Sequence, residues 1–250
     1  MSSHSKLSSH NSKLSSPVIG IDIGGTKIRG ILWGGKKVAR SEEFSTPKNK
    51  HDFQSKLTAL TTSLAGQNDI RGIGIGAAGI MERTTLLFSP NIPYIRNFDF
   101  RPLWHRSIPL RLDNDARSFA RAEFLTGAGR GAKRIFALTI GTGIGRSYGR
   151  SGKIMKLKKL EYPESWEKEY QAVRDTGDDK KLASFLADRL IPLLEPYEPD
   201  IVVVGGGVME HRGFLRLLRS SLKKRGFDVE VRRARFSENA VAIGAALLLG

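Results

Sequence analysis

Short apolar runs alternate along this chain with segments in which apolar residues recur at helical spacing. Residues 18–23 form an apolar run that is typical of a buried strand. Residues 51–66 carry apolar side chains three and four positions apart, which predicts an amphipathic helix. Residues 72–76 alternate glycine with isoleucine and indicate a strand that another backbone approaches closely. Strands that alternate with helices favour an α/β fold.

The same reasoning extends over the rest of the chain. Residues 87–109 are rich in proline and aromatic residues and indicate an extended loop, while residues 156–181 are highly charged and show no clear period. Further strands are expected at 27–33, 37–43, 109–112, 135–140 and 201–204, and further helices at 116–124, 182–194 and 238–249.

Three of the expected strands end in glycine-rich turns, which begin at Gly24, Gly141 and Gly205. Glycine permits tight turns and lets backbone N–H groups come close to an anion. The ligands of open α/β sheets gather at the carboxyl ends of strands. The three turns could therefore surround one polyphosphate group from two sides.

The first of these turns is flanked by side chains of suitable chemistry. Asp22 can hold Mg²⁺ through water, as this ion prefers. Thr26 and Lys27 can donate hydrogen bonds to phosphate oxygens. A glycine turn in an ordinary β-hairpin has the same short sequence pattern. This segment therefore indicates a phosphate site only if other motifs in the chain support it.

The composition supports a folded protein without a disulfide framework. Hydrophobic residues make up 40% of the 250 residues, and no apolar stretch approaches the roughly 20 residues of a membrane span. Cysteine is absent, which excludes thiolate sites for zinc and fits a cytoplasmic protein. Residues 1–16 are Ser-rich and of low complexity and indicate a disordered tail; His4 and His10 in it could bind metal, but a solvated tail is the simpler interpretation.

The net charge of +16 favours anionic partners such as a nucleotide, a phosphosugar or polyphosphate. Much of the positive excess lies in residues 212–235. These charges are not interleaved with a regular series of aromatic residues that would stack nucleotide bases. A solvated helix face followed by a strand therefore explains the segment better than a nucleic-acid patch, and nucleic acid is not expected as a partner.

The three glycine turns belong to a set of five short motifs along the chain. In chain order they are residues 22–27, 114–116, 141–145, 205–208 and 238–246. This set resembles the ROK sugar kinases, which belong to the actin-like, hexokinase-type ATPase superfamily, and the resemblance covers about residues 17–250. It implies two actin-like, ribonuclease H-like α/β lobes with a nucleotide and sugar cleft between them. The lobes would comprise residues 17–116, with the helix at 238–250 packing back on them, and residues 117–237.

The resemblance also implies a role for each motif. The first turn matches a phosphate motif with Mg²⁺ held through Asp22, the second turn matches another phosphate motif, and the third matches the motif at the adenosine. Asp115 would be the general base that takes the proton of the attacking hydroxyl. The other implied residues are Asn91 and Asn114 at the sugar, and Gly24, Gly25, Thr26, Lys27, Gly141, Thr142, Gly143, Gly205, Gly206 and Gly207 at the nucleotide.

The chain departs from the family pattern after the second phosphate motif. Members usually carry a Gly-Glu-Ile-Gly-His segment there, whose Glu and His contact the sugar, and many carry a Cys-rich zinc loop; both are missing from this sequence. Glu161 could replace the missing Glu, with Glu164 as a weaker candidate, although either could be a surface charge. Arg146 stands where small residues are common and could add a phosphate contact or crowd the nucleotide.

The resemblance implies an ATP-dependent sugar kinase, which would transfer a phosphoryl group from ATP-Mg²⁺ to a hydroxyl of a hexose or hexose derivative. Two alternatives stay open. In its missing zinc loop and its short length the chain resembles the polyphosphate-dependent glucokinases of the same family, and its basic composition would suit a polyanionic donor. A sugar or nucleotide sensor that has lost catalysis is the other alternative, because the family includes repressors. A homodimer is also compatible with the resemblance.

Overall fold

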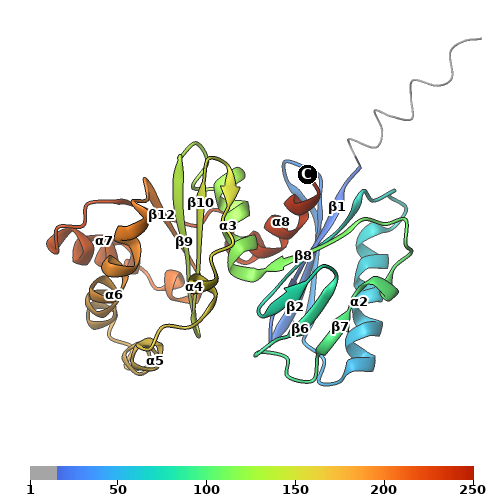
Figure 1. Cartoon of the computed structure of the whole chain (residues 1–250), viewed down its shortest axis with the longest axis horizontal. Coiled ribbons are helices and arrows are strands. Elements are labelled where there is room, and N and C mark those ends of the chain that lie inside the picture. The colour runs from blue at the N-terminus through green and yellow to red at the C-terminus, as the bar shows by residue number, and fades with distance from the viewer. Residues whose placement is uncertain (1–15) are drawn as a thin grey trace, which may run out of the picture. The chain divides into compact units, whose positions relative to one another are not determined.

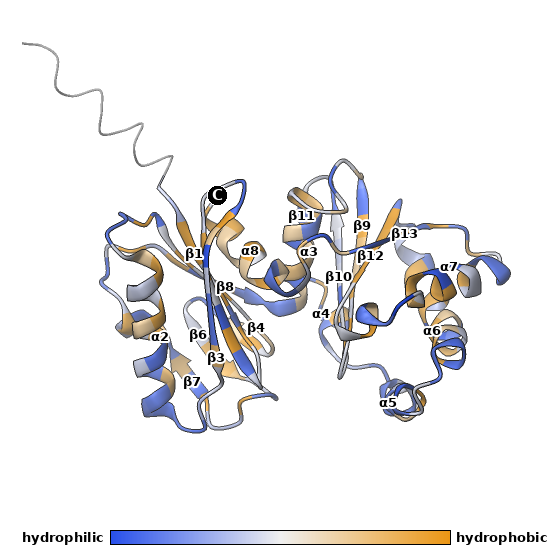
Figure 2. Ribbon diagram, turned by 180° about the vertical axis from the view of Figure 1, so that it is seen from behind, coloured by the Kyte–Doolittle hydropathy of each residue, from blue (hydrophilic) through white to orange (hydrophobic). Residues whose placement is uncertain are grey.

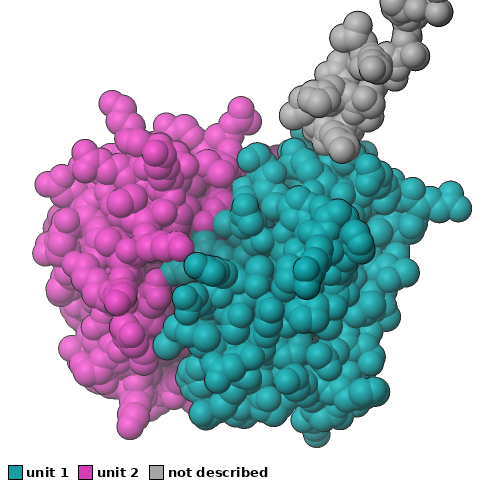
Figure 3. Space-filling view, turned by 45° about the vertical axis from the view of Figure 1, so that its right-hand side comes forward, with its two compact units in different colours: residues 1–118, 241–250 teal, residues 119–240 magenta. Residues whose placement is uncertain are grey.

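The computed structural model describes residues 16–250. The described chain divides into two compact units, which Figure 3 colours separately: unit 1 comprises residues 16–118 and 241–250, and unit 2 comprises residues 119–240. The expected tail at residues 1–16, with His4 and His10, lies outside the described residues except for its last position. Each unit is built around its own mixed sheet (Figure 1).

Unit 1 is organised around a five-stranded sheet of order β3-β2-β1-β4-β8. β2 pairs antiparallel with both β1 and β3, whereas β1, β4 and β8 are mutually parallel neighbours. The parallel register aligns Asp22 with Gly76 and Gly76 with Asp113, so the ends of these three strands lie at one edge of the sheet. The strand bounds are β1 (Val18–Ile23), β2 (Lys27–Trp33), β3 (Val38–Ser45), β4 (Gly72–Ala77) and β8 (Leu110–Asn114).

Helix α2 (Lys50–Ala65) packs on this sheet through its apolar face, as its sequence predicts. The side chain of Asn49 caps its first turn by accepting a hydrogen bond from the N–H of Asp52 at 2.9 Å. A side chain on Gly30 of β2 would lie within 2.8 Å of the Leu60 and Leu64 methyl groups, which shows how closely helix and sheet approach. Figure 2 shows the alternation of hydrophobic and hydrophilic residues along this helix.

The C-terminal helix packs against the same sheet. α8 (Ala240–Ala246) passes so close that a Cβ on Gly20 would lie 1.9 Å from the carbonyl oxygen of Ala242. A Cβ on Gly74 would lie 2.0 Å from the carbonyl oxygen of Ala245. The glycines of β1 and β4 therefore permit a helix–sheet approach that any larger residue would prevent. The short 3₁₀ helix η5 (Leu247–Leu249) follows α8.

The expectation of an extended loop over residues 87–109 is wrong in part. A second, three-stranded sheet in unit 1 consists of β5 (Ile80–Glu82), β6 (Thr85–Phe88) and β7 (Arg96–Asp99), and the 3₁₀ helix η1 (Arg101–Leu103) follows it. These strands are too short to show a period, and tertiary packing decides them. Phe98 stacks edge-on against Phe53 of α2 and against Phe100, with ring centroids 5.5 and 4.8 Å apart.

Unit 2 contains a five-stranded sheet of order β11-β10-β9-β12-β13. β12 is parallel to β9 and β13, and β10 is antiparallel to β9 and β11. β10 is absent from the sequence expectations because its glycines and Arg146 depart from the composition of a typical strand. The strand bounds are β9 (Arg134–Ile140), β10 (Ile144–Arg150), β11 (Lys153–Ile154), β12 (Ile201–Gly205) and β13 (Glu230–Arg233).

Helices fill much of the segment that shows no period in the sequence. The carboxylate of Asp178 caps the longest of them by accepting the N–H groups of Lys180 and Lys181, both at 3.0 Å. The basic stretch forms a helix and a strand, as expected, and the helix buries Phe214, Leu218 and Leu222. Helix α3 (Asp115–Leu125) begins in unit 1 and continues into unit 2. The other helices of unit 2 are α4 (Lys158–Glu161), α5 (Glu167–Asp175), α6 (Asp179–Leu194) and α7 (Phe214–Lys224), with 3₁₀ helices η2 (Glu195–Tyr197), η3 (Gly207–Glu210) and η4 (Ser237–Asn239).

Candidate functional site

Two carboxylates lie together at the strand-end edge of unit 1. Asp22 is the fifth residue of β1, and Asp115 is the first residue of α3, directly after β8. Burial and the nearby charge of Asp115 raise the pKa of Asp22 to about 7, although Arg29 and Lys27 act in the opposite direction. Burial also raises the pKa of Asp115. The N–H of Ala116 donates a hydrogen bond to its carboxylate at 2.9 Å and acts in the opposite direction, lowering this pKa. Two carboxylates that repel one another in this way suit a divalent cation, which would stabilise both ionised forms.

The start of α3 holds Asp115 in a defined orientation. The side-chain oxygen of Asn114 accepts the N–H groups of Ala116 and Arg117, at 3.0 and 3.3 Å, and so caps the helix. Asp113 is only 4% exposed, and its carboxylate pairs with the Arg117 guanidinium at 2.5 Å. Sequence reasoning missed this pair, although its spacing of four residues at a helix start is a signal for it.

The first glycine turn is also ordered by hydrogen bonds. The N–H of Gly24 donates to the carbonyl of Lys27 at 3.1 Å, and the hydroxyl of Thr46 donates to the carbonyl of Gly24 at 2.7 Å. A Cβ on Gly25 would lie 2.9 Å from the carbonyl oxygen of Asn91, so the structure brings Asn91 against this turn. Thr26 is exposed at the turn.

Lys27 has a partner other than a phosphate. Its ammonium group forms an ion pair with Glu43 of β3 at 3.2 Å, and the buried Arg29 pairs with the same carboxylate. Glu43 therefore neutralises part of the positive charge beside Asp22. The expected contact of Lys27 with a phosphate group stays a prediction.

The other two glycine turns lie side by side in unit 2. The parallel pairing of β9 and β12 aligns Thr139 with Gly205, so both strands end at the same edge. A Cβ on Gly206, which has a φ of 92°, would lie 2.5 Å from the carbonyl oxygen of Ile140. A Cβ on Gly141 would lie 3.9 Å from the N atom of Gly207. The expected phosphate and adenosine motifs of this unit are thus direct neighbours.

The residues at the departure from the family pattern lie in different surroundings. Glu161 is the exposed last residue of α4. The side chain of Arg146 is 2% exposed; it pairs with Glu167 at 2.8 Å and donates to the carbonyl of Tyr162 at 2.5 Å. The Arg146 side chain therefore lies in the interior of unit 2, where Glu167 and the carbonyl of Tyr162 are its partners.

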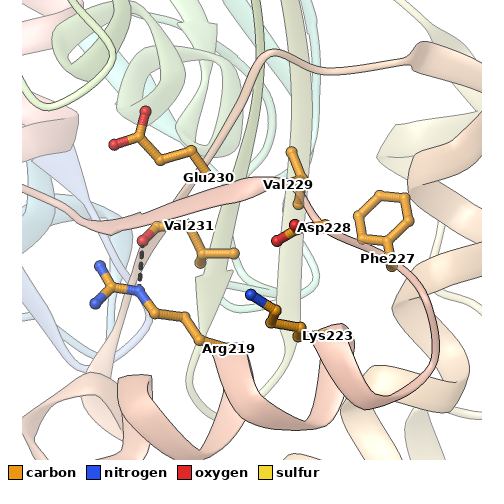
Figure 4. A pocket seen from close by; sticks show the side chains of 7 residues that line it. All are labelled: Arg219, Lys223, Phe227, Asp228, Val229, Glu230 and Val231. Atoms are coloured by element: carbon orange, nitrogen blue, oxygen red, sulfur yellow. Dashed lines mark hydrogen bonds between the residues drawn. The ribbon is translucent and has the colours of Figure 1, made fainter.

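Part of the basic stretch has structural partners. Arg225 forms a two-pronged pair with Asp188, at 2.6 and 2.9 Å. Figure 4 shows a pocket of about 430 Å³ between α7 and β13, where Arg219 donates to the carbonyl of Val231 at 2.7 Å. Lys223, Asp228 and Glu230 also line the pocket, so both signs of charge face it. It lies beside the amino end of β13, whereas the glycine turns lie at the carboxyl ends of the strands.

Over residues 16–250, no cluster of three or more His, Asp or Glu side chains is arranged to hold a metal ion. Any ion at the Asp22 and Asp115 pair would therefore keep water ligands or take ligands from a bound phosphate, as Mg²⁺ does. In the same part of the chain, no helix is long and apolar enough to cross a membrane.

Comparisons with known proteins agree with this arrangement. The model of the ROK family matches residues 18–156 and 170–250 and leaves out residues 157–169. The glucokinase of Streptomyces coelicolor is 30% identical over 135 residues, which are 51% of this chain and 41% of that protein. The chain thus matches less than half the length of this curated relative.

Solved structures share the fold over nearly the whole chain. The inorganic polyphosphate/ATP-glucomannokinase of Arthrobacter sp. strain KM is 25% identical with a TM-score of 0.78, covering 94% of this chain and 98% of the other. The ROK family glucokinase of Streptomyces griseus, solved with glucose and AMPPNP, is 22% identical with a TM-score of 0.76, covering 93% and 98%. The expected α/β, actin-like fold is confirmed.

Proposed function

Because this chain belongs to the ROK family, we propose that it is a sugar kinase that transfers a phosphoryl group from ATP to a hydroxyl of a hexose or hexose derivative. Glucokinases are among its relatives by sequence and by fold. The observation that carries the proposal lies in unit 1: the charge of Asp115 acts on Asp22, which precedes the glycine turn that Asn91 contacts.

In this proposal Asp115 accepts the proton of the sugar hydroxyl as the oxygen attacks phosphorus. Its position at the capped start of α3 fixes the carboxylate, and a buried carboxyl with a raised pKa is a stronger base than a free one. Asn91 and Asn114 hold sugar hydroxyls, and Glu161 takes the place of the missing family Glu. Orientation of the acceptor supplies much of the rate in phosphoryl transfer.

The pair of carboxylates also fits the magnesium ion that the family implies. Asp22 would hold Mg²⁺ through water, and the ion would offset the negative charge of the phosphate groups. Gly24, Gly25, Thr26 and Lys27 would surround the transferred group. In unit 2, where two glycine turns are neighbours, residues 141–143 would bind phosphate groups of a donor and residues 205–207 its adenosine.

Polyphosphate is the alternative donor. The Arthrobacter neighbour is named for its use of both polyphosphate and ATP, and the net charge of +16 suits a polyanionic donor. A sensor that binds sugar or nucleotide without transferring phosphate is the other alternative.

The experiment that separates these functions is a sugar panel assayed with ATP-Mg²⁺ and, in parallel, with polyphosphate. The proposal expects ADP and a sugar phosphate in stoichiometric amounts with at least one hexose. Sugar phosphate formed from polyphosphate alone would select the alternative donor. Sugar or nucleotide binding by calorimetry without product from either donor would select the sensor and refute the kinase.

A further inference from the structure

Helix α5 stands directly behind the second phosphate turn and holds its backbone. The hydroxyl of Tyr170 donates to the carbonyl of Gly141 at 2.5 Å. One nitrogen of Arg174 donates to the carbonyls of Gly141 and Thr142, at 2.8 and 3.0 Å. The Gln171 amide donates to the carbonyl of Thr142 at 3.3 Å. Three side chains, spaced along one face of α5, therefore fix two consecutive peptide carbonyls.

Fixing these carbonyls also fixes the N–H groups of the same peptide planes. In a trans peptide the C=O of one residue and the N–H of the next point in opposite directions. With the carbonyls of Gly141 and Thr142 directed at α5, the N–H groups of Thr142 and Gly143 are directed away from it. Both residues are exposed, and neither N–H has a hydrogen-bond acceptor among residues 16–250. Two adjacent free N–H groups on the same side of a turn can bind an anion, and we call the N–H groups of Thr142 and Gly143 the nest.

The charge of Arg174 also strengthens the N–H groups of the turn as hydrogen-bond donors. A cation that donates to a carbonyl polarises the peptide group, and the N–H at the other end becomes a stronger donor. The charge of Arg174 is shared with Asp175, to which it also donates at 2.7 and 2.9 Å. The hydroxyl of Tyr170 stays a donor, because burial raises the pKa of this tyrosine above its ordinary value.

The helix that carries these side chains is itself firmly held. The side chain of Tyr170 is fully buried in the core of unit 2. At the first turn of α5, Glu167 pairs with the buried Arg146 and accepts the N–H of Glu164 at 2.9 Å. The start of α5, up to residue 169, falls in the segment that the family model leaves out. The anchoring through Glu167 therefore belongs to the part of the chain that replaces the family's usual loop.

We propose that Tyr170 and Arg174 are positioning residues that hold the N–H groups of Thr142 and Gly143 as a preset nest for a phosphate group of the donor. That the anion is a donor phosphate rests on the proposed function, whereas the nest rests on the contacts of α5. Rigid N–H pairs bind phosphate without the entropy cost of ordering a glycine loop. The affinity for the donor, and not for the sugar, depends on these two side chains.

The test measures binding of ATP and of tripolyphosphate to the full chain by calorimetry, together with KM for ATP and for sugar. We expect Arg174→Gln to weaken binding of both anions about tenfold, since it removes charge-assisted bonds from two peptide groups. Tyr170→Phe keeps the buried ring and should weaken binding about threefold. Arg174→Lys, which keeps a cationic donor, should recover part of the loss. KM for the sugar should stay unchanged in all three variants.

Arg189→Gln is the matched control, because Arg189 of α6 pairs with Glu169 of α5 at 2.7 Å and has no hydrogen bond to the turn. It removes the same charge next to the same helix and should leave both anion affinities unchanged. The inference is overturned if a folded Arg174→Gln protein binds both anions as the wild type does, or if Arg189→Gln weakens them equally. Wild-type protein that binds tripolyphosphate through the nest but phosphorylates no sugar would refute only the proposed function.

Discussion

The candidate residues of unit 1 and those of unit 2 differ in their chemistry. In unit 1 the site consists of side chains at strand ends, with Asp22 and Asp115 close enough for their charges to interact. In unit 2 it consists of backbone, because two glycine turns lie side by side and α5 fixes their peptide planes. Side chains can move protons and hold ions, whereas backbone N–H groups can only bind. Under the proposed function, we therefore expect proton transfer to depend on unit 1 and phosphate binding to depend on the backbone of unit 2.

The largest effect is expected from a substitution that changes the candidate residues of unit 1 only. Asp115→Ala should lower kcat by ~10²–10⁴-fold, because it removes the base that takes the proton of the acceptor hydroxyl. Affinity for tripolyphosphate should change little, since the nest in unit 2 is intact. Steady-state kinetics and calorimetry on one preparation would measure both. Asp69→Ala, at an exposed position, serves as the control, and near-normal turnover in Asp115→Ala would remove this residue from the mechanism.

The second prediction concerns the buried ion pair beneath the base. Arg117→Gln leaves the Asp113 carboxylate buried without its guanidinium and should cost about 3–5 kcal/mol of the free energy of unfolding. The exposed pair of Arg225 and Asp188 in unit 2 offers the contrast, because Arg225→Gln should cost less than about 1 kcal/mol. Urea unfolding of both variants tests the difference. Equal losses would mean that burial does not set the value of the Arg117 pair.

The third prediction uses the raised pKa of Asp22, about 7 against an ordinary 3.8. The folded state binds this proton more tightly than the unfolded state, so the contribution of Asp22 to stability falls as the pH rises from about 4 to 7 and stays low above 7. The upper bound of this change is about 4 kcal/mol. Thermal unfolding between pH 5 and 8 should show the slope, and Asp22→Asn should flatten it.

Adding magnesium tests whether Asp22 causes this pH dependence of stability. Because a cation favours both ionised carboxylates, millimolar MgCl₂ should raise the midpoint of unfolding more at pH 8 than at pH 5. Asp22→Asn should lose this dependence on magnesium. A slope that persists unchanged in the variant would assign the pH effect to other groups.

The smallest expected effect probes the backbone of unit 2. Gly206→Ala places a Cβ 2.5 Å from the carbonyl of Ile140 at a positive φ, and should cost about 1–3 kcal/mol while weakening nucleotide binding. Gly207→Ala has no neighbour within 4 Å of its Cβ and is the matched control for stability. Chemical unfolding of the two variants measures the difference, and an equal loss would show that the contact between the turns is not tight.

One segment of this chain has no match in the family model. Residues 157–169 stand outside the family match, and they contain α4 and the first turn of α5. The pairing of Glu167 with Arg146 explains why an arginine follows the second glycine run, where small residues are common. The two changes belong together, because either charge alone would be buried without a partner.

Local sequence patterns predicted a large part of the fold. α2 and β2 lie within a residue of their expected bounds, and the basic stretch contains the helix and the strand expected in it. α2 and α7 each bury one apolar face, whereas β2 is buried along nearly its whole length. The small sheet β5-β6-β7 and strand β10 were missed, because short strands depend on neighbours more than on their own residues. The helices in the charged segment at 156–181 could not be predicted from the sequence. The buried Tyr170 anchors α5 and the Asp178 side chain caps α6, and neither contact produces a periodic pattern of apolar residues.

By itself the sequence determined the family and the residue types of the site, because motif order and glycine spacing are properties of the chain. Tertiary structure alone decided which of these residues meet. It brought Asn91 against Gly25 and the turns at 141–143 and 205–207 side by side, and it tied Lys27 to Glu43. The physical reason is that strand pairing between distant segments sets these distances, and no local pattern encodes the register of two strands that are far apart in the chain.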